Sequence, residues 1–319
     1  MSDDGMTTSL NILRRMPPGN VAKDLAGICQ LQPDLEDELY QRVDQPLGQA
    51  VDPTAGRPFL LCDYNRDGDS HRSPWTNAYF PPIEDGEGFV PSDNLRQLEI
   101  QANELFDVYR EMYYQGGVSS VYMWDLEPGF AACILIKKDV HHQRFVEEGG
   151  WNSIHVLEVH EKNDKEAVYT LTSTVLLTMN VSRRQELGHL NLDANLTRQT
   201  ERTMKFDSQT AHLSNMGRLV EDMEIDIRSN LDRVYISKTR EVLNGMRKLQ
   251  HGYGSVHVVI TSVGLTQHGI GSRLRKERTR LWGNSAVRFS NMASRRRRRR
   301  PNMANGGQVI VPSVQVQCS

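Results

Sequence analysis

The densest group of potential metal ligands in the sequence is the segment Asp63-Tyr64-Asn65-Arg66-Asp67-Gly68-Asp69. Its residues at positions 1, 3, 5 and 6 match the start of an EF-hand loop, in which oxygen atoms surround Ca²⁺. Position 12 should be a glutamate but is Pro74, and no flanking helices are predicted. The segment therefore favours a structural loop, in which Asp and Asn side chains accept hydrogen bonds from backbone N–H groups.

Catalytic chemistry has no recognisable motif in the chain. His141-His142 has no third ligand at metal-binding spacing, and we interpret it as a solvated turn between two strands. Phosphate-binding, dinucleotide-binding, serine-hydrolase and zinc-protease motifs do not occur. Four widely separated cysteines favour buried thiols: Cys29, Cys62, Cys133 and Cys318. We predict a protein that is not an enzyme and needs neither cofactor nor metal.

The charge of the chain is unevenly distributed. The 319 residues carry 38 Lys or Arg and 40 Asp or Glu, a net charge of −2. Residues 251–319 contain 12 Lys or Arg against one acid, Glu277, a charge of +11, so the first 250 residues carry −13. The run Arg295–Arg300 fits nucleic-acid binding or nuclear localisation, but a translated alternative exon or retained intron gives the same composition. We favour the latter, which makes nucleic acid an unlikely partner, and predict that this tail is disordered.

The hydropathy pattern excludes two further classes of protein. No stretch approaches 18 consecutive apolar residues, so no transmembrane helix is expected. The first 30 residues lack the apolar core of a secretory signal. We expect a globular body for most of the chain.

Prolines divide the first 50 residues into short amphipathic segments. Apolar residues recur at helical spacing before Pro17-Pro18, up to Pro33, and again up to Pro46. Isolated helices of this length are marginal in water. We expect them either to pack on each other as a small bundle or to lie separately on a larger core.

The middle of the chain predicts a loop, a helix and an antiparallel sheet. Residues 52–92 are rich in Pro, Gly, Asp and Asn and predict an ordered loop, while the apolar stripe of residues 93–114, ended by Gly116-Gly117, predicts a helix. Four antiparallel strands are predicted, the first two joined by a turn at Pro128-Gly129: 118–124, 130–137, 153–159 and 167–179. Such a sheet has two unpaired edges, which proteins usually cover or pair.

A long helical pattern follows at residues 209–250, with apolar residues at heptad-like spacing from Leu213 to Val234. At 1.5 Å per residue it would span about 63 Å, more than one small sheet requires. Its apolar stripe is either shared with a partner or buried within this chain. Together these elements predict an α+β fold.

The segment LCDYNRDGDSHRSPW at Leu61–Trp75 is similar to the signature of the F-actin-capping protein beta subunit family. Other segments resemble the same family: LRRMPP at Leu13–Pro18, GGVSSVYMWDLEPGFAACILIKK at Gly116–Lys138 and NMGRLVEDMEIDIRSNL at Asn215–Leu231. The resemblance is collinear from residue 1 to about residue 250 and stops before the basic tail.

The resemblance implies a heterodimer with a capping-protein alpha subunit. It implies a helical stalk at 1–50, then a loop, a helix and a sheet continued by the alpha subunit at 51–205, then a long helix over the sheet at 206–250, before the divergent tail at 251–319. The implied function is calcium-independent binding to the barbed ends of actin filaments, which blocks subunit addition and loss, in the cytoplasm at the cytoskeleton. The family's C-terminal amphipathic helix, its tentacle, is replaced here, so we expect weakened capping.

The resemblance also implies roles for particular residues. Basic actin-binding positions map onto Arg198 and Arg228, whereas two others map onto Gln97 and Asp226, where positive charge is lost or reversed. A surface for peptides of capping regulators is implied around Arg15 and Tyr79. The family's signature loop comprises Cys62, Asp63, Tyr64, Asn65, Arg66 and Asp67.

A second hypothesis keeps the heterodimer but not the activity. In it the protein is a scaffold whose basic tail binds nucleic acid or anionic lipid, and capping is lost. Salt-dependent binding of residues 251–319 to such polyanions would distinguish the two hypotheses.

Overall fold

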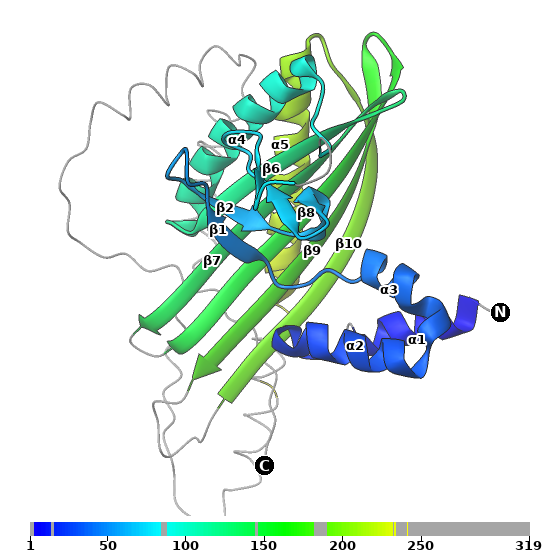
Figure 1. Cartoon of the computed structure of the whole chain (residues 1–319), viewed down its shortest axis with the longest axis vertical. Coiled ribbons are helices and arrows are strands. Elements are labelled where there is room, and N and C mark those ends of the chain that lie inside the picture. Colours follow the sequence, from blue (N-terminus) through cyan, green and yellow to red (C-terminus); the bar gives the residue numbers. More distant parts are fainter. Residues whose placement is uncertain are drawn as a thin grey trace, which may run out of the picture. The chain divides into compact units, whose positions relative to one another are not determined.

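The computed structural model describes residues 3–13, 16–83, 88–143, 146–181 and 190–231, together with Arg233 and Glu241. The predicted basic tail, the predicted helix after Leu231 and the candidate residue Arg15 lie outside the described residues. Figure 1 shows the helices and strands in chain order. The last helix among the described residues falls in a second compact unit that begins at Thr210.

Three short helices form an N-terminal bundle: α1 (Asp3–Leu13), α2 (Val21–Leu31) and α3 (Glu36–Arg42). Two 3₁₀ turns separate them, η1 (Pro18–Asn20) and η2 (Pro33–Leu35). Each turn begins with proline, whose fixed φ suits a first helical turn and whose missing N–H is not needed there. The prolines therefore set the helix boundaries, as predicted.

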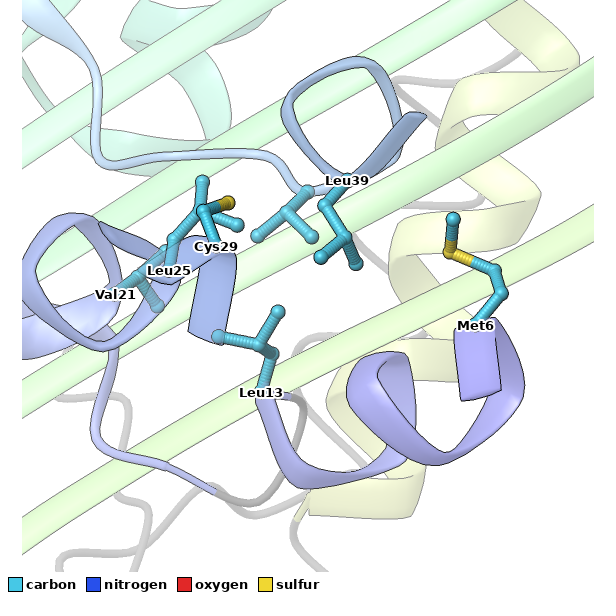
Figure 2. Packing of buried hydrophobic residues seen from close by; sticks show 7 residues of the cluster. Met6, Leu13, Val21, Leu25, Cys29 and Leu39 are labelled. Carbon is cyan, nitrogen blue, oxygen red and sulfur yellow. The ribbon is translucent and has the colours of Figure 1, made fainter. Parts of the chain in front are cut away.

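This bundle has a hydrophobic core of its own, shown in Figure 2. Val21, Leu25 and Leu39 have no exposed surface. The buried members of the core come from all three helices and the residue after them: Met6, Leu13, Val21, Leu25, Cys29, Leu39 and Val43. The expectation that the helices pack on each other is confirmed, and the alternative of helices spread separately over a larger core is wrong.

Short strands replace much of the loop predicted at 52–92. They form a pair and a three-stranded sheet, both antiparallel: β1 (Gly48–Val51) with β2 (Pro58–Leu61), and β3 (Arg66–Asp67), β4 (Ser70–Arg72) and β5 (Tyr79–Phe80). The 3₁₀ turn η3 (Asp63–Asn65) joins β2 to β3. Strands of two to four residues are too short to show a hydropathy period, which is why the sequence predicted only a loop.

Helix α4 (Asp93–Tyr114) occupies the predicted residues. Its C-cap is Gln115, which adopts the left-handed conformation at φ 53°, one residue before the predicted Gly116. The glycines that follow are needed for a different reason. At Gly117, with φ 89°, a Cβ atom would clash with the carbonyl oxygen of Lys137, so the chain can pass close to the neighbouring strand only without a side chain.

The central sheet is a five-stranded antiparallel meander, whose long strands lie side by side in Figure 1. Its strands pair in sequence order: β6 (Val118–Leu126), β7 (Gly129–Gln143), β8 (Val146–Asn163), β9 (Glu166–Val181) and β10 (Leu190–Lys205). Only four strands were predicted. β10 was missed because it is mostly polar, which is typical of an edge strand. His141 and His142 lie within β7, so their assignment to a turn was wrong.

One face of the sheet packs against the β1–β2 pair. The buried cluster there contains Leu47, Leu60, Tyr122, Cys133, Leu135 and Ile154. Polar contacts reinforce it, because the Tyr122 hydroxyl donates to the Leu60 carbonyl at 2.8 Å and the Leu60 N–H donates to Ser120 Oγ at 3.0 Å. On the opposite face, Tyr114 of α4 packs edge-on against Trp151 of β8. The sheet is therefore covered on both faces near β6.

Helix α5 (Gln209–Leu231) carries the predicted apolar stripe, with Leu213, Met216 and Ile227 among its buried residues. His212 on the same helix is buried, and this burial lowers the pKa of its imidazole to about 4. The imidazole is therefore neutral at physiological pH and behaves as part of an apolar face. Among the described helices, none combines the length and hydropathy of a membrane span.

Candidate functional site

The signature loop is organised by the side chain of Asn65, which is 3% exposed. Its Oδ1 accepts the N–H of Cys62 at 2.9 Å, and its Nδ2 donates to the carbonyls of Leu60 at 3.2 Å and Arg72 at 3.0 Å. Asn65 thus joins β2, η3 and β4. The predicted structural use of this loop is confirmed for Asn65. Within the described residues, no three His, Cys, Asp or Glu side chains are grouped as metal ligands would be.

The other charged residues of the loop are exposed. Arg66 lies 3.9 Å from Asp63 and 3.8 Å from Asp69, with half of its side chain in solvent. Exposed ion pairs of this geometry contribute little to stability. Asp67, the last signature residue, pairs with Ser70 in the β3–β4 ladder. The signature charges are therefore available to a partner molecule.

A cavity of about 200 Å³ lies beside this loop, lined by residues including Asp44, Cys62, Asp63, Tyr64 and His71. Burial raises the pKa of Asp44 and lowers the pKa of His71, so burial disfavours the charged form of both groups. The ring of Tyr64 stacks on that of Trp124 with 6.1 Å between their centroids. Carboxyl, imidazole and aromatic groups therefore meet at one cavity beside the signature loop.

Behind the loop, an ion pair is buried between β4 and α4. Arg72, 3% exposed, donates to both carboxylate oxygens of Glu99, which is 0% exposed, at 2.9 and 2.7 Å. The same carboxylate accepts the N–H of Met123 at 2.6 Å and a hydrogen bond from Arg96. Arg72 also donates to Asn77 at 2.6 Å. The charges are compensated and most of the hydrogen-bonding positions are used, as a buried pair requires.

Four residues further along α4, Asn103 makes two hydrogen bonds to one residue of β6. Its Oδ1 accepts the N–H of Val121 at 2.9 Å, and its Nδ2 donates to the carbonyl of the same residue at 2.8 Å. These backbone groups point away from β7. At the start of the helix, Ser92 donates through its N–H and hydroxyl to the carboxylate of Asp125. Helix α4 therefore runs antiparallel to β6 and is bonded to its outer edge.

The opposite edge of the sheet, at β10, has no such cover in the part of the chain that the structure describes. Backbone groups of antiparallel strands alternate between their two neighbours. The backbone groups of Val121 point out of the sheet, and the observed register connects this residue across the strands to Arg198, whose backbone groups therefore face β9. The N–H and C=O groups of Thr197, Gln199 and Glu201 consequently point away from β9. These three residues are exposed. The edge can thus accept hydrogen bonds from another strand.

The remaining predicted residues are placed as follows. Arg198 is exposed on β10, and Arg228 lies in the last turn of α5, 3.3 Å from the Glu224 carboxylate. Tyr79 on β5 donates its hydroxyl to the carbonyl of Phe89 at 2.8 Å, next to the exposed side chains of Phe89 and Val90. Arg198 and Arg228 belong to separate units, and their joint role stays a prediction.

Sequence reasoning missed Arg72, Glu99 and Asn103. One signal could have found two of them, because Glu99 and Asn103 lie four residues apart within the apolar stripe of α4. Polar side chains at buried helix positions require partners outside the helix. Both residues bond the backbone of the edge strand β6. Backbone groups are the same in every residue, so the sequence does not show which strand these side chains bond.

Comparison with known proteins gives consistent matches. A family model described as "F-actin capping protein, beta subunit" matches residues 6–243. The chain is 49% identical over 251 residues to an F-actin-capping protein subunit beta of Drosophila melanogaster, covering 78% of this chain and 90% of the relative. A protein with the same description from Dictyostelium discoideum is 44% identical over 249 residues, covering 77% and 90%. Among solved structures, a homodimeric actin capping protein alpha subunit from Plasmodium berghei aligns with a TM-score of 0.47 and 15% identity, over 79% of this chain and 98% of that chain.

Proposed function

Because the chain belongs to the F-actin capping protein beta subunit family, we propose that it is the beta subunit of a heterodimer that binds the barbed ends of actin filaments. The family consists of structural actin-binding proteins, not enzymes. The observation that carries the proposal is the family match over residues 6–243, which includes every described helix and strand from α2 to α5. Bound at a barbed end, the heterodimer blocks subunit addition and loss without calcium.

The alpha subunit pairs with β10 in this proposal. The outward backbone groups of Thr197, Gln199 and Glu201 supply donors and acceptors for a further antiparallel strand. A partner strand would continue the sheet and remove its open edge, which otherwise favours aggregation. In this proposal, apolar residues of the long helix also contact the alpha subunit. The complex belongs at the cytoskeleton in the cytoplasm.

In this proposal, basic side chains of this chain contact actin. Actin is acidic, so exposed arginines steer association and stabilise the encounter, with an effect that salt weakens. Arg198 is exposed, whereas Arg228 shares its charge with Glu224. Gln97 and Asp226 stand where the family has basic residues, so fewer positive charges face actin here.

Replacing Arg198 or Arg228 with alanine is expected to weaken capping by about three- to tenfold at low salt, and less at high salt. Capping affinity is measured from the inhibition of barbed-end elongation by the complex with the alpha subunit. Arg42→Ala is the matched control, because Arg42 is an exposed stalk arginine that pairs with Glu38. Intact heterodimer must be verified first, since Arg198 lies on β10. Affinities equal to that of the control would contradict the assignment of these arginines.

The tail at 251–319 replaces the family's usual terminal amphipathic helix, and we propose that it contributes nothing to capping. A complex truncated after Gln250 is then expected to cap as strongly as the full chain, and both more weakly than a complex containing the D. melanogaster relative. The elongation assay measures all three. A strong loss on truncation would show instead that the tail binds actin.

Capping regulators are proposed to bind near Tyr79. The exposed Phe89 and Val90 beside it offer apolar contacts to a peptide, and Asp44 and Asp63 of the cavity beside the signature loop offer hydrogen-bond acceptors. Arg15, the other residue implied for this surface, lies outside the described residues.

A further inference from the structure

At the edge of β6, helix α4 supplies a substitute for a neighbouring strand. Residues 99 and 103 of α4 are four apart, a rise of about 6 Å along a helix. Residues 121 and 123 of β6 are two apart, about 6.8 Å along a strand. The two spacings nearly coincide, so side chains from one face of the helix can meet successive outward-facing residues of the strand.

Asn103 reproduces the contacts of a peptide group. A residue of a neighbouring strand would accept the N–H of Val121 and donate to its C=O, and the side-chain amide of Asn103 does both, at 2.9 and 2.8 Å. Few side chains have an acceptor and a donor in one plane, as an amide does. Asn103 is 3% exposed, so it shields these backbone groups from water as well as bonding them.

Met123 is the next residue of β6 whose backbone groups point out of the sheet, and two different side chains bond its N–H and its C=O. Glu99 accepts the N–H of Met123 at 2.6 Å, and Arg72 donates to its C=O at 3.4 Å. The second contact is long and supplements the ion pair between the two side chains. Val121 and Met123 are thus both bonded through N–H and C=O to side chains from outside the sheet.

The signature loop has a part in this arrangement. Asn65 donates to the backbone carbonyl of Arg72 at 3.0 Å and so fixes the position from which the guanidinium reaches Glu99. The loop therefore connects the sheet surface that holds the β1–β2 pair to the outer edge of β6. Its buried polar residues serve this edge, while its exposed charges face solvent.

We propose that Asn103, Glu99 and Arg72 close the β6 edge against strand addition, and that without Asn103 two copies of this chain pair through their β6 strands. The segment VSSVYMWDL of β6 is rich in β-branched and aromatic residues and carries a single charge, a composition that favours pairing between identical strands. A two-fold axis would bring the strands together antiparallel. With the β6 edge closed, a further strand can add only at β10. The inference rests on the proposed function, in which the alpha subunit supplies that strand.

The test is the mass of the complex of the full chain with the alpha subunit, measured by light scattering across a range of concentrations. Wild type is expected to contain one copy of each subunit. Asn103→Leu preserves side-chain volume but has no polar atoms, and its complex is expected to double in mass. Hydrogen exchange at the Val121 amide should accelerate by at least about tenfold, while exchange at the centre of the sheet stays unchanged.

Asn94→Leu is the matched control, because the same change is made at an exposed position of the same helix. It should keep the wild-type mass. If Asn103→Leu does not fold, Asn103→Ala is used, since alanine favours the helix and also removes both hydrogen bonds. A folded variant at position 103 that keeps the wild-type mass at every concentration overturns the proposal. A wild-type chain that fails to bind the alpha subunit would contradict the proposed function instead.

Discussion

Replacement of Gln199 by proline will weaken association with the alpha subunit about a hundredfold while leaving the five-stranded sheet folded. The N–H of Gln199 points away from β9, so among the described residues proline removes no hydrogen bond of the sheet. Towards a partner strand the same change removes a donor and places a ring in the path of the incoming backbone. We expect a loss of about 3 kcal/mol, roughly a hundredfold in affinity. Recovery of the tagged alpha subunit on co-expression measures it.

Two control variants distinguish a loss of binding to the alpha subunit from a loss of folding. Gln199→Ala removes the side chain but keeps the N–H, so recovery of the alpha subunit should match wild type. Thr200→Pro moves the proline to a residue opposite Leu171, where the N–H faces β9, and should destabilise the sheet itself. Circular dichroism and thermal melting report on the fold of each variant. Normal recovery with Gln199→Pro would refute partner binding along β10.

Replacement of Glu99 by glutamine will cost about 3–5 kcal/mol of unfolding free energy, a large part of the stability of an ordinary domain. The shape of the side chain is retained, but Arg72, with 3% of its surface exposed, then faces a neutral amide. A buried charge without its counter-ion is costly, and the hydrogen bond to the Met123 N–H weakens at the same time. Denaturant titration of the purified complex measures the loss.

The surface pair of Glu38 and Arg42 provides the comparison. It has the same charges at 3.5 Å, but both side chains are more than half exposed, so Glu38→Gln should change stability by no more than about 0.5 kcal/mol. A double replacement, Arg72→Met with Glu99→Leu, removes both charges and should recover part of the loss. Glu99→Gln with less than about 1 kcal/mol of destabilisation would show that water or another group compensates Arg72.

Elements with a strong local signal were predictable from the sequence. Helix α4 has 22 residues with a continuous apolar stripe, and the observed bounds Asp93–Tyr114 equal the predicted ones. In the bundle, Pro18 and Pro33 begin the turns that separate the helices, and the effect of proline on the backbone does not depend on tertiary contacts. The turn at Pro128-Gly129 likewise lies between β6 and β7.

Elements defined by long-range contacts were not predictable in this way. Strand β10 owes its conformation to pairing with β9 along its whole length, and its polar sequence carries no period of its own. The ion pair of Arg72 and Glu99 joins residues 27 positions apart, which no local pattern reports. The family resemblance supplied Arg198 and Arg228, but the bonding of the β6 edge became visible only with the backbone in place.

The order of the strands has a consequence for biosynthesis. Every neighbour in the sheet is also a neighbour in sequence, so each strand can pair with the previous one as it leaves the ribosome, with little loop-closure entropy. Helix α4 precedes β6 and can close the first edge at the start of this process. Among the described strands β10 emerges last. The nascent subunit therefore exposes an edge that can bind another strand only after the other four strands can have paired.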